Sequence, residues 1–378
     1  MALTPISKLA RISPLSGNSV FPIVQNGTTY GAEISSVNYL NNLQTVTDAG
    51  FTTTNSLSVA SLTATGKIIG GINNTANGDK AAVLGGYINT ASGNCSNVAG
   101  GYCNTASGNW SNVGGGKDNA ASGNGSIIAG GYFLRATCDY SFIGGGNSNT
   151  VTGSHATIGG GGSNCATGSC TFIGGGSDNN ATGNYSIVVG GGQFENENIA
   201  SGCRSIIVGG AGNNSSGSHS ITVGGRNNDS ANTYSFVGGG TLNSALSACA
   251  TVVGGRDNLA SGQKSSIVGG IGNCATATNS FVGGGNGNKA VGFNSGVGAG
   301  SGNCASGQHS FVVGGKQNSV NHNDSFIIGS NITSNAACTT FVNNLSAQGS
   351  IFAGNGFTGD IAGCTSITVT NGIITAAS

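Results

Sequence analysis

The sequence contains very few charged residues. Only 6% of its 378 residues are Asp, Glu, Lys or Arg, whereas a typical globular protein has about 25%. Twelve basic residues balance twelve acidic ones, so the net charge is zero. A neutral chain does not attract nucleic acid or an anionic membrane surface electrostatically. We therefore expect no nucleic-acid partner.

Proline and long apolar runs are also scarce. Three Pro beside 72 Gly, without a Gly-X-Y period, exclude a collagen triple helix. No run approaches the roughly 18 apolar residues of a membrane span, so we expect no membrane insertion. The first residues, MALTPISKLARISPLSGNSVFPIV, lack the apolar segment of a signal peptide. We expect assembly in a cytoplasm, without export by a Sec signal.

What the sequence does contain is a short repeat. Aligned on their Gly pairs, residues 70–328 form seventeen consecutive units, sixteen of fifteen residues and one of nineteen. The second position is always Gly, the fifth is Asn except at Leu134, and the fourteenth is Val or Ile except at Thr222. A disordered chain has no reason to hold an apolar residue at one phase through seventeen repeats, although Gly, Ser and Asn dominate its composition.

This period predicts an all-β fold, a parallel β-roll or β-solenoid with one coil per unit. Fifteen residues accommodate two short strands and two turns but not a helical hairpin. The Gly pair supplies one turn because Gly accepts positive φ, and Gly at the ninth position supplies the other. Alternation along each strand places positions twelve and fourteen, and positions five and seven, inside the coil.

The Asn column at the fifth position has two interpretations. Stacked Asn side chains can form an amide ladder along a β structure. Alternatively, Asn is present because it tolerates the turn conformation after the Gly pair.

Each coil has little apolar volume to bury. Burial of one Val or Ile stabilises by roughly 1.5–3 kcal/mol, whereas ordering fifteen backbones costs more than roughly 15 kcal/mol. Backbone ladders and burial between chains must supply the difference. We therefore expect parallel chains packed side by side, as a homotrimer.

The run A-S-G-x-x-S-x-φ-φ-G-G, as in residues 260–270 and 305–315, resembles the head repeats of trimeric autotransporter adhesins. That resemblance implies a trimeric parallel β-roll, although the family's unit is usually one residue shorter. The flanks resemble a different group. Residues 6–40 and 43–59 are similar to N-terminal segments of phage virion and tail fibres, and residues 365–378 are similar to the C-terminal strand pair of small phage tail proteins.

Catalytic and metal-binding constellations are not evident. Three of the four His share the eleventh position on widely separated coils, and Asp is absent from most units. Eleven Cys are present, but those of one phase are never on adjacent coils. Two coils span about 9.6 Å, beyond the roughly 4.4–6.8 Å of a disulfide. We expect no enzyme, no cofactor and no metal, and reduced thiols unless bridges form between chains.

The eleventh position varies most and has a high aromatic share. Its diversity indicates an outward side chain, and aromatic and polar groups on a ridge suit carbohydrate. Two hypotheses follow: binding of a host glycan, or coverage of a seam between chains. The residues assigned to this site are Trp110, Tyr140, His155, Tyr185, His219, Tyr234 and His309.

These expectations divide the chain into an attachment module (1–45), a neck (46–69), a β-roll shaft (70–328) and a C-terminal cap or tip (329–378). The predicted function is a structural fibre of a bacteriophage particle, a virion appendage that adheres to a host surface glycan or protein. The N-terminal module would bind other virion proteins. A self-assembling extracellular filament and a bacterial surface adhesin are the alternatives.

Overall fold

The computed structural model describes residues 19–25, 28–34, 66–192 and 196–343. The chain separates into two compact units, residues 1–63 and 64–378. Of the segment 6–40 that resembles phage fibres, residues 6–18, 26–27 and 35–40 lie outside the described residues, as do the resembling segments 43–59 and 365–378.

The first unit contains one β-hairpin. Strands β1 (Ser19–Gln25) and β2 (Thr28–Ile34) are antiparallel, paired from Ser19 with Ile34 to Gln25 with Thr28. Two residues, Asn26 and Gly27, separate them in the sequence. Asn-Gly is the dipeptide most favoured for two-residue hairpin connections, so the local sequence explains the pairing.

The second unit is a parallel β-solenoid of about 18 coils, which confirms the predicted fold class. Each coil contributes one strand to each of two sheets. The Asn/Ala sheet contains the strands at positions five to seven: β4 (Thr75–Ala76), β6 (Thr90–Ala91), β8 (Thr105–Ala106), β10 (Ala120–Ala121), β12 (Arg135–Ala136), β14 (Thr150–Val151), β16 (Cys165–Ala166), β18 (Asn179–Ala181), β20 (Asn198–Ala200), β22 (Asn214–Ser215), β24 (Asp229–Ser230), β26 (Ser244–Ala245), β28 (Leu259–Ala260), β30 (Cys274–Ala275), β32 (Lys289–Ala290), β34 (Cys304–Ala305) and β36 (Ser319–Val320).

The second sheet, the Val/Ile sheet, contains mainly the strands at positions thirteen and fourteen. Its members are β3 (Ile68–Ile69), β5 (Ala82–Val83), β7 (Asn97–Val98), β9 (Asn112–Val113), β11 (Ile127–Ile128), β13 (Phe142–Ile143), β15 (Thr157–Ile158), β17 (Phe172–Ile173), β19 (Ile187–Val188), β21 (Ile206–Ile207), β23 (Ile221–Thr222), β25 (Phe236–Val237), β27 (Thr251–Val252), β29 (Ser266–Ile267), β31 (Phe281–Val282), β33 (Gly296–Val297), β35 (Phe311–Val312), β37 (Phe326–Ile328) and β38 (Thr340–Val342). Strands of successive coils pair in parallel, as Phe142 pairs with Thr157. The last strand, β38, lies within the segment that the sequence assigned to the cap.

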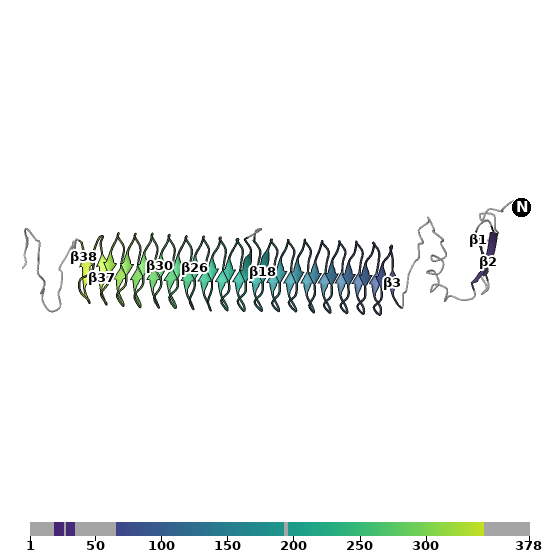
Figure 1. The fold of residues 1–378 in the computed structure, drawn as a ribbon, viewed down its shortest axis with the longest axis horizontal. Coiled ribbons are helices and arrows are strands. Elements are labelled where there is room, and N and C mark those ends of the chain that lie inside the picture. The colour runs from purple at the N-terminus through teal and green to yellow at the C-terminus, as the bar shows by residue number, and fades with distance from the viewer. Residues whose placement is uncertain (1–18, 26–27, 35–65, 193–195, 344–378) are drawn as a thin grey trace, which may run out of the picture. The chain divides into compact units, whose positions relative to one another are not determined.

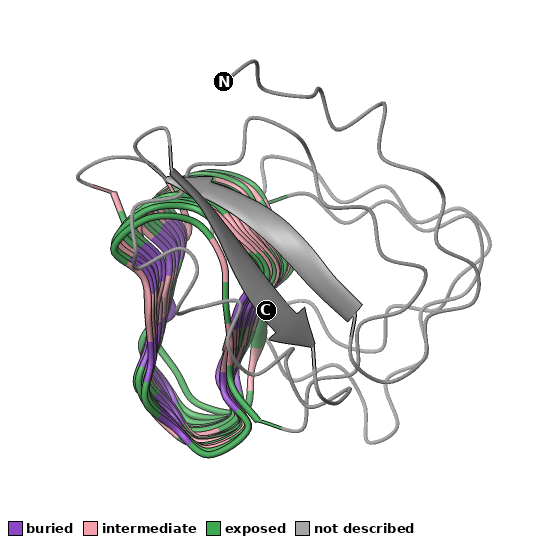
Figure 2. Cartoon of the chain, turned by 90° about the vertical axis from the view of Figure 1, so that its right-hand side faces the viewer, coloured by how far each residue is buried: buried purple, intermediate pink, exposed green. Residues whose placement is uncertain are grey.

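The core is a pair of facing columns inside the stack (Figure 2). Ala at position seven and Val or Ile at position fourteen are fully buried, as in Ala106 and Val113. Asn at position five and Ser at position twelve are buried with them. The inward positions predicted by strand alternation are therefore confirmed.

The apolar core is interrupted in the middle. One buried cluster ends at Ile207 and the next begins at Val237. Between them Thr222 takes the place of Val, and its hydroxyl lies 2.9 Å from Ser230 Oγ in a buried polar contact. Ser215 contacts Ser220 in the same way, at 2.7 Å. Each of these buried hydroxyls hydrogen-bonds to another, so all four have a partner where the apolar core is interrupted.

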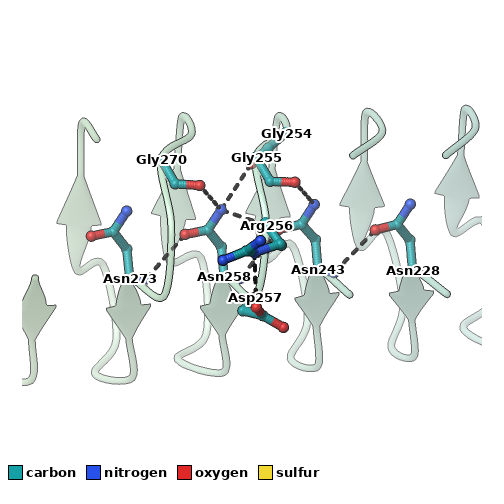
Figure 3. A network of polar contacts seen from close by, with 9 residues as sticks. All are labelled: Asn228, Asn243, Gly254, Gly255, Arg256, Asp257, Asn258, Gly270 and Asn273. Carbon is teal, nitrogen blue, oxygen red and sulfur yellow. Dashed lines mark hydrogen bonds and ion pairs between the residues drawn. The ribbon is translucent and has the colours of Figure 1, made fainter. Parts of the chain in front are cut away.

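The Asn column forms a ladder, mainly through backbone partners (Figure 3). Asn258 Nδ2 donates to the carbonyl of Gly254 at 3.0 Å and to that of Gly270 in the next coil at 2.9 Å. Asn258 Oδ1 accepts the N–H of Asn273 at 3.0 Å. The amide thus ties together two coils, and direct amide contacts such as Asn258 Nδ2 to Asn243 Oδ1 (3.1 Å) add to it.

The alternative explanation of the Asn column, that Asn adopts the turn conformation itself, is wrong. Positive φ occurs at the second, fourth and eleventh positions, for example at Gly86, Ile88 and Cys95. Asn89, at the fifth position, has no positive φ. The ninth-position Gly has a different role, because a Cβ on Gly93 would collide with the Gly108 carbonyl of the next coil. Close stacking, and not positive φ, favours Gly there, although five units carry a different residue at this position: Cys138, Asn232, Ser247, Ala277 or His322.

Candidate functional site

The eleventh-position side chains form a line along one turn of the coils, here called the eleventh-position ridge. Of the seven predicted residues, six are exposed and His219 is half-buried. Trp110 is 64% exposed, Tyr140 60% and Tyr234 59%. The outward orientation predicted from their diversity is confirmed, whereas their binding role stays a prediction.

The ridge brings some of these residues together across adjacent coils. Tyr140 stacks on His155 with ring centroids 5.1 Å apart, and His219 stacks on Tyr234 at 5.0 Å. The guanidinium of Arg204 lies over the ring of Tyr185 at 5.4 Å. Tyr140 and His155 form one aromatic platform, whereas Tyr185, Arg204, His219 and Tyr234 occupy four consecutive coils and form a second, longer row.

A neighbouring Ser fixes the orientation of two ridge His rings. Ser154 Oγ lies 2.9 Å from His155 Nδ1, and Ser218 Oγ lies 3.0 Å from His219 Nδ1. Each contact joins positions ten and eleven of one coil. A held imidazole loses less rotamer freedom when a ligand binds, and rigidity of this kind favours recognition.

The remaining predicted residues lie apart from those platforms. His309 Nδ1 is 3.3 Å from Asp324 Oδ1 in the next coil, and its ring meets the edge of Phe293 at 5.8 Å. Next to Trp110 along the ridge stands Gly125, and the ring of Tyr140 leans toward it. The Tyr140 ring thus takes the place that a side chain at position 125 would occupy.

The backbone at the ridge is strained. Every predicted ridge residue has positive φ, from 51° at His309 to 60° at Tyr185. The left-handed region costs a non-Gly residue roughly 1–2 kcal/mol, and Gly occupies this position only at Gly125. Sixteen units keep a side chain where Gly would relieve strain. Strain retained in this manner favours a functional role for the side chains.

A second aromatic surface was missed by the sequence interpretation. The aromatic corner comprises Tyr87, Tyr102, Lys117, Tyr132 and Phe133, at positions three and four of successive coils. Tyr87 and Tyr102 have ring centroids 5.7 Å apart, and Lys117 Nζ lies 5.5 Å from the rings of both Tyr102 and Tyr132. These side chains are exposed on the turn opposite the ridge. The third position carries a sequence signal for this surface, because it is Tyr in three of four successive units, at Tyr87, Tyr102 and Tyr132.

One titratable group of the corner is perturbed. The side-chain hydrogen bond with Cys103 raises the pKa of Tyr102, and the negative charge that Cys103 can carry adds to the effect. The exposed Tyr102 hydroxyl has a single O–H, so a ligand oxygen that accepts from it would replace Cys103 as its partner.

Reactive groups do not converge in the described part of the chain. Within it, no three His, Cys, Asp or Glu side chains lie close enough to hold a metal ion. Its ten cysteines are all unbridged. Burial raises the pKa of Cys165, with Glu197 adding to the shift, and burial also raises that of Cys304, where Lys289 opposes it. None of its helices is long and apolar enough to span a membrane.

The nineteen-residue unit leaves the stacking intact. Its extra residues include 193–195, which lie outside the described part of the structure. Asn179 and Asn198, on either side, pair in register across β18 and β20. The Asn198 amide donates to Asn179 Oδ1 at 3.0 Å, so the Asn ladder passes the insertion.

Comparison with known proteins adds no family to this description. No protein-family model matches the chain, and no curated protein matches it significantly.

Proposed function

We propose that this chain is a structural fibre of a bacteriophage particle, a projecting rod that adheres to a host surface and has no catalytic role. The observation that carries the proposal is the solenoid itself, about 18 coils with exposed aromatic side chains held on strained backbone. At about 4.8 Å per coil, the stack is roughly 85 Å long. A rigid rod that presents contact groups along its length can project from a particle and adhere to a surface.

The phage assignment rests on the flanking sequences. Residues 6–40, 43–59 and 365–378 resemble segments of phage fibre and tail proteins. In this proposal the N-terminal module, residues 1–45, binds other virion proteins, and three parallel chains form the rod. The rod is a virion appendage assembled in the host cytoplasm.

Immunogold electron microscopy tests this location. Antibody against residues 66–192 should label appendages on phage particles released by the organism that encodes the chain. Label on the bacterial envelope would replace the proposal with a surface adhesin. Label on free filaments would replace it with a self-assembling extracellular filament.

Adhesion is assigned to the eleventh-position ridge, with a surface glycan as ligand. Aromatic faces pack against the C–H faces of sugars, while the polar groups beside them donate hydrogen bonds to hydroxyls. The platform of Tyr140 and His155, with Ser154 beside it, offers both kinds of group. A host protein is the other class of receptor.

A ridge variant tests the binding role. Changing Trp110, Tyr140, Tyr185 and Tyr234 to Ser should abolish binding of the labelled chain to host cells and to a glycan array. The matched control changes Lys80 and Lys264 to Ser, because these residues occupy the same backbone position without a ring. Unchanged binding with a lower melting temperature would instead show that the aromatic residues cover a seam between chains.

A further inference from the structure

The Val/Ile sheet has an outer face that is uncharged and largely apolar, although it is interrupted at Asn97, Asn112, Thr157, Thr251 and Ser266. It is formed by positions thirteen and fifteen, and we call it the apolar face. Large exposed side chains recur along it, with exposures of 49% at Val189, 49% at Val253, 42% at Phe172 and 46% at Ile328. None of the seventeen units carries a charged residue at either position.

The outer face of the Asn/Ala sheet has a different character. Its outward positions, six and eight, carry mostly Thr, Ser and other polar residues, and they include Arg135, Asp229 and Lys289. Both sheets are built from the same coils, so the backbone does not explain why their outer faces differ in polarity. An apolar face opposite a polar one indicates that only the polar face stays exposed to solvent in the assembled protein.

The size of the side chains on the apolar face varies from coil to coil. Of the six coils with Phe at position thirteen, four have Gly at position fifteen, as in Phe236 with Gly238, and two have Val313 or Ile328 there. In the four coils the Phe ring lies over the Gly, because a Cβ on Gly238 would be 3.3 Å from Phe236 Cε1. Another coil has Gly at both positions, Gly296 and Gly298. Large apolar side chains therefore lie beside small ones on this face.

Packing of one sheet on another suits a face of this kind. Facing sheets lie about 10 Å apart, with their side chains interdigitated. Interdigitation needs large side chains beside small ones, and the apolar face provides both. The uncharged, largely apolar face therefore fits a second sheet packed against it.

The area of the face agrees with a stable interface. About 18 coils at about 4.8 Å each, with two outward residues spanning roughly 7–10 Å, give roughly 600–850 Å² per chain. A standard protein interface buries about 800 Å² on each partner. Apolar patches left open on monomers rarely exceed a few hundred Å².

From these observations we infer that copies of this chain pack on one another through the apolar face. A second copy has the same coil spacing, so its side chains stay in register along the whole length. The inference deepens the homotrimer of the proposed function by naming the surface that joins the chains, and it does not depend on the phage assignment. In a trimer, this face of each chain would turn toward the common axis.

Light scattering after size exclusion of the full-length chain tests the inference. The wild type should have a mass that is a multiple of 36.6 kDa. A triple variant, V208K/V253K/V313K, places a charge on the apolar face at three well-separated coils and should be monomeric with an unchanged circular dichroism spectrum. These side chains are 43%, 49% and 41% exposed, so the coil itself tolerates Lys.

The matched control is S201K/S261K/S306K, which adds the same charge to the outer face of the Asn/Ala sheet and should keep the wild-type mass. If the Lys variant does not fold, V208S/V253S/V313S takes its place and should raise the dissociation constant in sedimentation equilibrium at least tenfold. A monomeric wild type, or equal masses for all variants, would overturn the inference. A dimer that only the apolar-face variant dissociates would support the inference and reject the trimer.

Discussion

The Asn ladder can be tested at Asn288, in a coil that also offers its own control. Asn288 Nδ2 donates to the Gly284 carbonyl at 2.8 Å and to the Gly300 carbonyl at 2.9 Å. Asn288 Oδ1 accepts the N–H of Asn303 at 3.0 Å. The change Asn288→Ala removes all three contacts. It leaves the Gly284 carbonyl and the Asn303 N–H without a partner, whereas the Gly300 carbonyl still accepts the N–H of Asn286 at 2.9 Å.

The expected loss follows from those two groups. An unsatisfied buried polar group costs about 1–3 kcal/mol; the low end applies to the partly buried Gly284 carbonyl and the middle of the range to the buried N–H of Asn303. The sum is about 3 kcal/mol for local opening. Since each 1.4 kcal/mol corresponds to a factor of ten, amide exchange in the two coils should accelerate by roughly a hundred-fold.

Hydrogen exchange with mass spectrometry is the suitable assay, because a long repeat array does not unfold in one step. Peptides covering residues 284–313 report the effect. The control is Asn286→Ala, two residues away, where the side chain is exposed. Acceleration of less than tenfold at Asn288→Ala, or equal acceleration in the control, would refute the argument that the Asn amides hold the coils together.

Two further predictions concern titratable groups. Burial raises the pKa of Asp229, and the hydrogen bond from Asn214 Nδ2 (3.0 Å) only partly offsets the shift. Because the pKa of Asp229 is higher in the folded than in the unfolded chain, folding stability is lost as the pH rises through the folded pKa. Asp229→Asn should therefore raise the melting temperature at pH 7 and give no gain below about pH 3.9. Equal gains at pH 3 and pH 7 would contradict this. Cys165 is half-buried with a raised pKa, whereas Cys170 is exposed. Iodoacetamide at pH 8 should therefore alkylate Cys170 at least tenfold faster, measured on peptides after timed quenching, and equal rates would show that burial does not protect Cys165.

The coil and its inward residues could be predicted because they depend on local alternation and on a fixed period. Ala106 and Val113 are buried for reasons that the sequence displays: they are small or β-branched and recur at one phase. The polar break at Thr222 could have been located in the same way, since Ser215 and Ser230 also depart from the usual Ala. Its hydrogen bonds required coordinates, because they join residues eight positions apart across the coil.

The backbone conformations of the turns could not be predicted. Gly at the second position indicated positive φ there, but the eleventh position has positive φ with Trp110, Tyr140 and Lys80. Nothing in these side chains requires the left-handed region. The ladder imposes it, because each eleventh-position N–H donates to a carbonyl of the preceding coil, as Trp110 does to Asn94 at 2.8 Å.

One trace of this constraint is visible in the sequence once the conformation is known. No Val, Ile or Thr occurs among the seventeen residues of the eleventh position, although such residues fill the neighbouring strands. β-branched side chains are especially unfavourable at positive φ, so the backbone disfavours them at this position, although Ile88 adopts positive φ at the fourth position. The residue type at the eleventh position therefore varies among those that tolerate the positive φ imposed by stacking. This variation allows contact groups such as Tyr140 and His155 to occupy a coil whose other positions repeat.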